Sequence, residues 1–321
     1  MRLVIDTDPG MGSLGTDPED GFAILYALGS PGVTVEGITL THGNVPVSHS
    51  WSNANHLLQL AGRPDVPVHA GAHEPRDTQK RALQTSWLNQ REGLTRLAPE
   101  LTLPESTAVE FLTSTVADSP GEITVVAIGP LTNIAAAIEA DDTFAANLDR
   151  LVIMGGAATC GGNITPAAEF NIWMDPEAAD GVFGSGAPIT MVGLDVCHQT
   201  SFDTSQVDAL AERGSKLASF AAECSKAWID IRGAADDGDG SLHLYDSLAV
   251  AAAIDPDLVG CRDLLVQIET GDGPAQGMTV TYTNEILRML LVGKNPNTSV
   301  ALDVEVDRFA ALFAQRVTAT L

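Results

Sequence analysis

Residues 3–28 hold a strand, a turn and a helix, and this unit constrains the fold more than any other stretch. The apolar run Leu3, Val4 and Ile5 predicts a buried strand, which Pro9-Gly10 prevents from continuing. Apolar residues then recur at helical spacing over 22–28. Asp17-Pro18-Glu19-Asp20 is typical of a helix start, with a capping residue, a first-turn proline and two acids. A buried strand that leads into a helix indicates an α/β protein.

The same alternation of strand and helix continues through most of the chain. Further strands are predicted at 33–40, 66–68, 123–128, 151–154, 189–194, 264–268 and 300–306, and helices at 49–61, 106–117, 204–212, 215–231, 246–254 and 308–317. Residues 74–104 show no clear period and are predicted to form a long surface excursion. The alternation implies an open, mostly parallel central sheet with helices on both faces, in a single large domain over residues 1–321.

Charge and cysteine content restrict the environment and the partners. The chain has 42 acidic and 17 basic residues, a formal net charge of −25, so nucleic acid is not expected as a partner. Such a surface suits a halophilic protein, since salt screens its self-repulsion. The four cysteines match no zinc spacing and are expected to be reduced in the cytoplasm. With no secretory or membrane-spanning segment in view, no membrane partner is expected.

Four carboxylates are expected to meet where the first strand ends. Asp6 and Asp8 end this strand, and Glu19 and Asp20 begin the next helix. Crowded carboxylates resist ionisation unless a cation lies among them, and a hard divalent ion such as Ca²⁺ or Mg²⁺ suits oxygen ligands. Ligands of open α/β sheets bind at the carboxyl ends of strands. The alternative is that these acids only cap a helix and solvate a loop.

A glycine-rich phosphate loop is a second interpretation of the same stretch. Gly10, Gly12 and Gly15 have the G-x-G-x-x-G spacing of dinucleotide-binding proteins. The preceding pair of aspartates would repel a pyrophosphate, however, and residues 3–28 contain no Lys or Arg. We therefore favour the metal site.

Residues 168–178 hold a second group of polar side chains. Glu169 and Asn171 alternate with Phe170 and Ile172, so in an extended backbone both polar groups would point the same way. An amide that donates and accepts, beside a carboxylate that accepts, can hold sugar hydroxyls. Alternatively, each is a turn residue.

Taken together, ordered motifs along nearly the whole chain resemble those of the nucleoside hydrolases of the inosine-uridine type. The matching pieces are Asp6-Thr7-Asp8-Pro9-Gly10, Gly43-Asn44, Ile128-Gly129-Pro130-Leu131-Thr132-Asn133, Met154-Gly155-Gly156, Asn163, Ala168-Glu169-Phe170-Asn171, Asp175-Pro176-Glu177-Ala178 and Tyr245-Asp246. The resemblance implies hydrolysis of the N-glycosidic bond of ribonucleosides to ribose and free base, in purine or pyrimidine salvage. It also implies a homodimer or homotetramer.

The resemblance further implies the roles of individual residues. One Ca²⁺ would be held by Asp8, Asp20, Asp246 and the main-chain oxygen of Ile128, with Asp6 orienting this cluster from behind. Asp8 would also take the proton from the attacking water. The sugar would be bound by the remaining residues of the set, Glu19, Asn44, Asn163, Glu169 and Asn171.

This sequence departs from the family pattern in two places. The family usually has an Asp-Asp pair one residue after Asp-Pro-Gly, whereas here residues 11–18 intervene and could form a lid. Whether Asp17 or Asp20 binds the metal is therefore open, although Asp20 directly precedes the Gly-Phe-Ala helix start of the family.

The second departure concerns the leaving group. The family usually has a histidine before the last calcium ligand, as proton donor to the base, and this chain has Tyr245 there. His243 could substitute, or it could be a loop histidine without a role. Trp228 could stack on a nucleobase, or belong to the core.

Two other functions remain as alternatives at this point. The first is a Mg²⁺-dependent phosphohydrolase with an aspartate nucleophile, although the four lysines lie at no expected strand end. The second is a non-catalytic nucleoside- or sugar-binding protein that has kept the calcium site.

Overall fold

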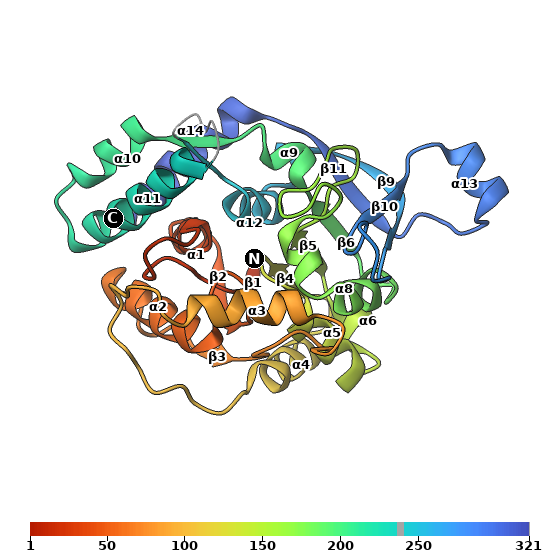
Figure 1. Ribbon diagram of the computed structural model, residues 1–321, viewed down its shortest axis with the longest axis horizontal. Helices are drawn as coiled ribbons and strands as arrows, with labels where there is room; N and C mark the ends of the chain where they lie inside the picture. Colours follow the sequence, from red (N-terminus) through yellow and green to blue (C-terminus); the bar gives the residue numbers. More distant parts are fainter. Residues whose placement is uncertain (236–240, 321) are drawn as a thin grey trace.

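The computed structural model describes residues 1–235 and 241–320. Within these residues the central sheet has nine strands, in the order β10-β9-β11-β6-β5-β4-β1-β2-β3 (Figure 1). These strands are β1 Arg2–Thr7, β2 Thr34–Leu40, β3 Val68–Ala70, β4 Ile123–Ala127, β5 Arg150–Met154, β6 Ile189–Val192, β9 Val259–Ile268, β10 Thr279–Tyr282 and β11 Thr298–Val304. A separate two-stranded sheet pairs β7 Ser201–Asp203 with β8 Ser241–His243.

Most neighbouring strands of the large sheet run parallel. Only β9 is antiparallel to its neighbours β10 and β11. At the centre, β1 lies between β2 and β4, and Asp6 is in register with Thr39 on one side and Ala127 on the other. The carboxyl ends of these strands therefore meet at one edge of the sheet, and the loops that follow them begin side by side.

Helices cover both faces of this sheet. They are α1 Glu19–Leu28, α2 Val47–Leu60, α3 Ala82–Arg91, α4 Ala108–Asp118, α5 Thr132–Ala140, α6 Phe144–Asn147, α7 Phe170–Met174, α8 Pro176–Phe183, α9 Leu194–Cys197, α10 Thr204–Ala211, α11 Lys216–Ala235, α12 Asp246–Ile254, α13 Glu285–Leu291 and α14 Val306–Thr318, with the 3₁₀-helix η1 Pro256–Leu258. None of the helices in the described part of the chain is both long and apolar enough to span a membrane.

Side chains of the first strand pack alternately into two apolar cores. Leu3 and Ile5 belong to the core that contains residues of α1, α12 and α14, whereas Val4 belongs to the core that contains residues of α5 and α8. This alternation is what a strand buried on both faces requires. The predicted fold is thereby confirmed as one α/β domain with a mostly parallel sheet covered on both faces.

Two local predictions were wrong. Residues 74–104 contain the helix α3, which was not predicted because only Gln84 and Leu88 of its ten residues are buried and no apolar stripe marks it. The third strand is Val68–Ala70 and begins where the predicted strand 66–68 ends. Its parallel pairing with β2, from Ile38 to Leu40, fixes these bounds, and pairing is a property of the assembled sheet.

Candidate functional site

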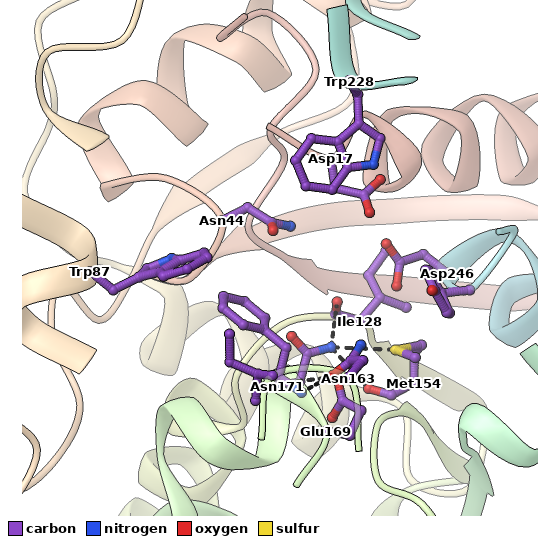
Figure 2. Close-up of a pocket in the computed structure, with 13 residues that line it drawn as sticks. Asp17, Asn44, Trp87, Ile128, Met154, Asn163, Glu169, Asn171, Trp228 and Asp246 are labelled. Carbon is purple, nitrogen blue, oxygen red and sulfur yellow. Dashed lines mark hydrogen bonds between the residues drawn. The ribbon is translucent and has the colours of Figure 1, made fainter. Parts of the chain in front are cut away.

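A cavity of about 160 Å³ lies at the carboxyl edge of the sheet (Figure 2). Strand ends supply one part of its wall, with Ile128 after β4 and Met154 at the end of β5. Residues far apart in the sequence supply the rest of the wall, including Asp17 before α1 and Asp246 at the start of α12. The cavity therefore forms where parallel strands end, as predicted.

Asp8 is completely buried beside the cavity and keeps one oxygen without a partner. Its Oδ2 accepts a hydrogen bond from the Asn44 backbone N–H at 2.5 Å, while no donor contacts its Oδ1. Gly43 and Gly129 allow this approach, because a Cβ atom on either glycine would collide with the Asp8 carboxyl group. The backbone at Gly43 and Gly129 thus packs directly against the Asp8 carboxyl group.

Asp20 lies against Asp8 and is held by three donors. Its Oδ1 accepts from Thr7 Oγ1 at 2.5 Å and from the Asp8 backbone N–H at 3.2 Å. Its Oδ2 accepts from Asn44 Nδ2 at 3.0 Å. Burial raises the pKa of Asp8, and the negative charge of Asp20 raises it further. The two carboxylates are therefore crowded enough to favour a shared cation.

Asp246 and Asp6 complete the buried acids around Asp8. Burial raises the pKa of Asp246, and the negative charge of Asp20 raises it further. Burial also raises the pKa of Asp6 to about 7, although Thr39 Oγ1 at 2.5 Å and Asn133 Nδ2 at 2.8 Å both donate to its Oδ1. Asp6 Oδ2 is buried and has no hydrogen-bond partner. These acids come from β1, α1 and α12.

The donor chemistry at this place fits a hard cation. Carboxylate oxygens and a main-chain carbonyl are the ligands that Ca²⁺ takes in proteins, and the unpartnered Asp8 Oδ1 is a buried acceptor that needs a positive group. Among residues 1–235 and 241–320, no three acidic, histidine or cysteine side chains stand together as a ready ligand cluster. A cation held by Asp20 and by the oxygen of Ile128 would share these acceptors with donors already present, Asn44 Nδ2 at 3.0 Å from Asp20 Oδ2 and Asn171 Nδ2 at 3.1 Å from the Ile128 oxygen.

Glu169 and Asn171 line the cavity, but not through the extended backbone that was predicted. Glu169 precedes α7, and its carboxylate caps this helix by accepting from the N–H groups of Asn171 at 2.8 Å and Ile172 at 3.2 Å. Asn171 Nδ2 donates to the carbonyl oxygens of Ile128 and Met154. The prediction of an extended segment was wrong because the carboxylate stabilises a helix start.

Asn44 and Asn163 also line the cavity, as was expected of sugar-binding residues. Asn163 Oδ1 accepts a hydrogen bond from the backbone N–H of Phe170 at 2.9 Å. Its amide nitrogen therefore lies at the cavity wall near the start of α7 (Figure 2). The polar groups around this end come from the loop after β2 and from the loop between β5 and α7.

Glu19 lies elsewhere. It is fully buried and accepts hydrogen bonds from the backbone N–H groups of Asp246 and Ser247, the latter at 3.0 Å, and from the Ser247 hydroxyl. The cavity wall contains Asp17 and not Glu19. This position does not support the ribose contact expected of Glu19. No sequence signal separated the two acids, because they are only two residues apart in one acidic run.

Aromatic side chains form the rest of the wall. Trp228 on α11 and Tyr245 line the cavity, together with Trp87 on α3, which was not predicted because its helix was not recognised. The Trp87 ring lies 5.4 Å from the Phe170 ring and carries the Arg91 guanidinium 3.4 Å above its centroid. Aromatic side chains at a cavity wall suit a planar heterocycle.

His243 lies behind Tyr245. The two rings are 5.6 Å apart, and His243 Nδ1 is 3.2 Å from the carbonyl oxygen of Thr200. Tyr245 is part of the cavity wall and His243 is not. The structure thus offers the tyrosine, and not the histidine, directly to a bound molecule.

Comparison with known proteins agrees with the resemblance found in the sequence motifs. The model of the protein family described as "Inosine-uridine preferring nucleoside hydrolase" matches residues 3–311. The chain is 38% identical over 288 residues to a "Probable uridine nucleosidase 2" of Arabidopsis thaliana, covering 88% of this chain and 86% of that protein. It is 34% identical over 320 residues to a "Pyrimidine-specific ribonucleoside hydrolase" of Salmonella arizonae, covering 99% and 98%.

Solved structures agree with the sequence comparison. A purine-preferring ribonucleoside hydrolase from Gardnerella vaginalis has a TM-score of 0.84 at 32% identity and covers 100% of this chain and 99% of that one. A plant nucleoside hydrolase has a TM-score of 0.81 at 33% identity, with coverages of 99% and 98%. The match extends over the whole fold.

Proposed function

The chain belongs to the inosine-uridine preferring nucleoside hydrolase family, and from this premise we propose that it hydrolyses ribonucleosides with the help of a Ca²⁺ ion among Asp8, Asp20, Asp246 and the Ile128 carbonyl. It is an N-glycosidase, as its relatives and structural neighbours are ribonucleoside hydrolases. The observation that carries the calcium proposal is the fully buried Asp8 with its unpartnered Oδ1 beside Asp20. These relatives and structural neighbours favour hydrolysis over the phosphohydrolase and over the non-catalytic binding protein.

We assign to Asp8 the removal of a proton from the attacking water. Water attacks the anomeric carbon as the bond to the base nitrogen breaks, and one water proton moves to Asp8. A calcium ion, when bound, supplies positive charge that acidifies water and holds the ribose hydroxyls. Positive charge that develops on the sugar is stabilised by the nearby carboxylates. Asn44, Asn163, Glu169 and Asn171 orient the sugar.

The base leaves with a second proton, and Tyr245 is the donor that its position at the cavity wall supports. His243, whose ring lies behind the Tyr245 ring, would supply this proton through the tyrosine. Trp228 would stack on the base. The named relatives include a uridine nucleosidase and a purine-preferring hydrolase, so an activity test must cover both classes of base.

The deciding experiment measures reducing sugar released from a panel of purine and pyrimidine ribonucleosides, with Ca²⁺ and after treatment with a chelator. We expect ribose release that disappears on chelation and returns when Ca²⁺ is added back. Ribose release that is indifferent to chelation would overturn the calcium proposal but not the activity. Phosphate release from a monoester, or nucleoside binding without turnover, would favour one of the two alternatives instead.

We also propose that the protein forms a homodimer or homotetramer through the helix α13, which extends away from the body of the molecule (Figure 1). Five of its apolar side chains, Ile286, Leu287, Met289, Leu290 and Leu291, are between 51% and 78% exposed. In a chain with a net charge of −25, a second copy can approach most easily over such an uncharged surface.

Light scattering after size-exclusion chromatography tests this assembly. Leu290→Asp with Leu291→Asp should yield a smaller particle than the unmodified chain. Leu83→Asp, at a comparably exposed leucine on α3, is the matched control and should leave the mass unchanged. An unmodified chain that runs as a monomer would rule out the proposal.

The cellular setting is likewise a proposal. The four cysteines are free thiols in the described part of the chain, which supports a reducing compartment such as the cytoplasm. Release of free base and ribose supports a place in purine or pyrimidine salvage. The acidic composition supports a high-salt habitat.

A further inference from the structure

We propose that Asp17, carried by residues 11–18, is the carboxylate that accepts a hydrogen bond from a ribose hydroxyl of the substrate, and that Glu19 on α1 instead has the structural role of stabilising the start of α12. The inference rests on the proposed function. It reassigns the sugar-facing acid to a residue that neither the family pattern nor the acidic run singles out. Asp17 and Trp228 both line the cavity (Figure 2), and Glu19 does not.

Glu19 is unavailable to a ligand because its carboxylate already serves the start of α12. It is completely buried and accepts from the N–H groups of Asp246 and Ser247 and from the Ser247 hydroxyl. The first N–H groups of a helix have no partner within the helix, and a carboxylate there is stabilised by the helix dipole. Turning Glu19 toward the cavity would leave these donors without an acceptor.

Residues 11–18, which the sequence allowed to be a lid, are packed against their surroundings and hold Asp17 in position. Met11 and Thr16 are buried, and the Thr16 hydroxyl bonds to the carbonyl oxygens of Gly10 at 2.9 Å and Ser13 at 2.8 Å. The Leu14 N–H donates to the Thr95 oxygen at 2.8 Å. A side chain at Gly10 would collide with the Asp17 carbonyl oxygen. This packing makes the segment part of the cavity wall.

The surroundings of Asp17 suit a hydroxyl donor. One of its carboxylate oxygens accepts the Glu19 N–H at 3.1 Å, which orients the group just before α1. Asp17 also lies close enough to Asp246 for its negative charge to raise the pKa of Asp246. This is the end of the cavity where the proposed cation would hold the sugar. An ionised carboxylate accepts hydrogen bonds, and the hydroxyls of a ribose can donate them.

The experiment compares Asp17→Asn with the unmodified enzyme on uridine, 2′-deoxyuridine and 3′-deoxyuridine, with Ca²⁺ present. The unmodified enzyme must hydrolyse uridine, which establishes the proposed function separately. We then expect Asp17→Asn to raise KM for uridine about 10-fold to 100-fold. It should change KM much less for whichever deoxynucleoside lacks the contacted hydroxyl. Equal losses on all three nucleosides, or no loss, would overturn the proposal.

Two controls separate a sugar contact from other roles. Asp65→Asn removes one exposed carboxylate far from the cavity and should leave KM unchanged. Calcium affinity, followed by calorimetric titration of the metal alone, should stay within about 3-fold in Asp17→Asn. A large loss of calcium affinity would instead make Asp17 a metal ligand and contradict the proposal. Glu19→Gln should lower the melting temperature without changing the ratio of uridine to deoxyuridine hydrolysis.

Discussion

Asp8 combines complete burial, a neighbouring carboxylate and one oxygen without a donor. Replacing it by the isosteric Asn removes both the proposed proton acceptor and one charge of the proposed cation site. We predict that Asp8→Asn lowers kcat by about 10²-fold to 10⁴-fold. Its melting temperature without calcium should equal or exceed that of the unmodified chain, since a buried repulsive charge disappears. Rates of ribose release and thermal unfolding curves measure the two effects. Retention of more than a tenth of the activity would contradict the role of Asp8.

His42 is a buried neutral imidazole next to this site. Its Nε2 lies 3.0 Å from Thr132 Oγ1, which in turn donates to Asp175 Oδ2 at 2.7 Å, so Nε2 carries the proton. Burial lowers the pKa of His42 from 6.5 to about 3. Between these pH values the unfolded chain binds a proton that the folded protein does not.

The free energy of unfolding should therefore fall as the pH drops from about 6.5 toward 3, by on the order of a few kcal/mol from His42 alone. His42→Gln keeps a donor to Thr132 and cannot titrate. We predict that this variant loses less stability over the same pH range, as measured by urea unfolding at several pH values. Parallel pH curves for the two proteins would show that His42 does not contribute.

At the scale of elements, the turn at Gly12 decides how residues 11–18 pack. Gly12 has a φ of 124°, and a Cβ atom there would lie 2.5 Å from Asn53 Oδ1 of α2. Asn53 Nδ2 holds the same loop through the Pro9 carbonyl oxygen at 2.9 Å. A side chain at Gly12 would thus both strain the backbone and push the loop from its support.

We predict that Gly12→Ala lowers the free energy of unfolding by about 2–4 kcal/mol and raises KM, because Asp17 moves with the loop. Gly32→Ala is the matched control. Gly32 also has a positive φ of 76°, but a Cβ atom there would meet nothing within 4 Å. It should cost only about 1 kcal/mol and leave KM unchanged. Urea unfolding and nucleoside kinetics distinguish the two variants, and equal effects would mean that the loop does not support the cavity.

At the scale of the whole molecule, the net charge of −25 repels itself in any compact state. The ion pairs that offset it are mostly exposed, such as Arg63 with Asp65, and contribute little. We predict that raising KCl from about 0.1 M to about 2 M increases the melting temperature by several degrees, because the Debye length shortens to a few ångströms. Differential scanning fluorimetry measures the shift. A melting temperature that falls with salt would contradict a halophilic protein.

The sequence by itself determined the α/β class and predicted a site at the carboxyl edge of the sheet. Runs such as 3–5 and 125–128 are apolar without alternation, because strands buried on both faces need apolar side chains throughout. The acids and amides that follow such runs must gather at one sheet edge, whatever the details of packing. For that reason acids that follow the first strand, such as Asp8, could be expected at that edge before any coordinates. The roles of Asn44 and of the Ile128 carbonyl were expected only through the family resemblance.

Tertiary structure alone decided which of the neighbouring acids faces the cavity. Asp17 and Glu19 are chemically alike and two residues apart, and only the arrival of α12 beside α1 turns Glu19 away. Likewise α3 and its Trp87 are held by contacts with distant segments, such as the Trp87 Nε1 bond to the Gly43 oxygen. A local sequence pattern indicates secondary-structure propensity and the spacing of apolar residues. Which side chain meets a ligand depends on contacts between residues far apart in the chain, and these exist only once the sheet and its helices have assembled.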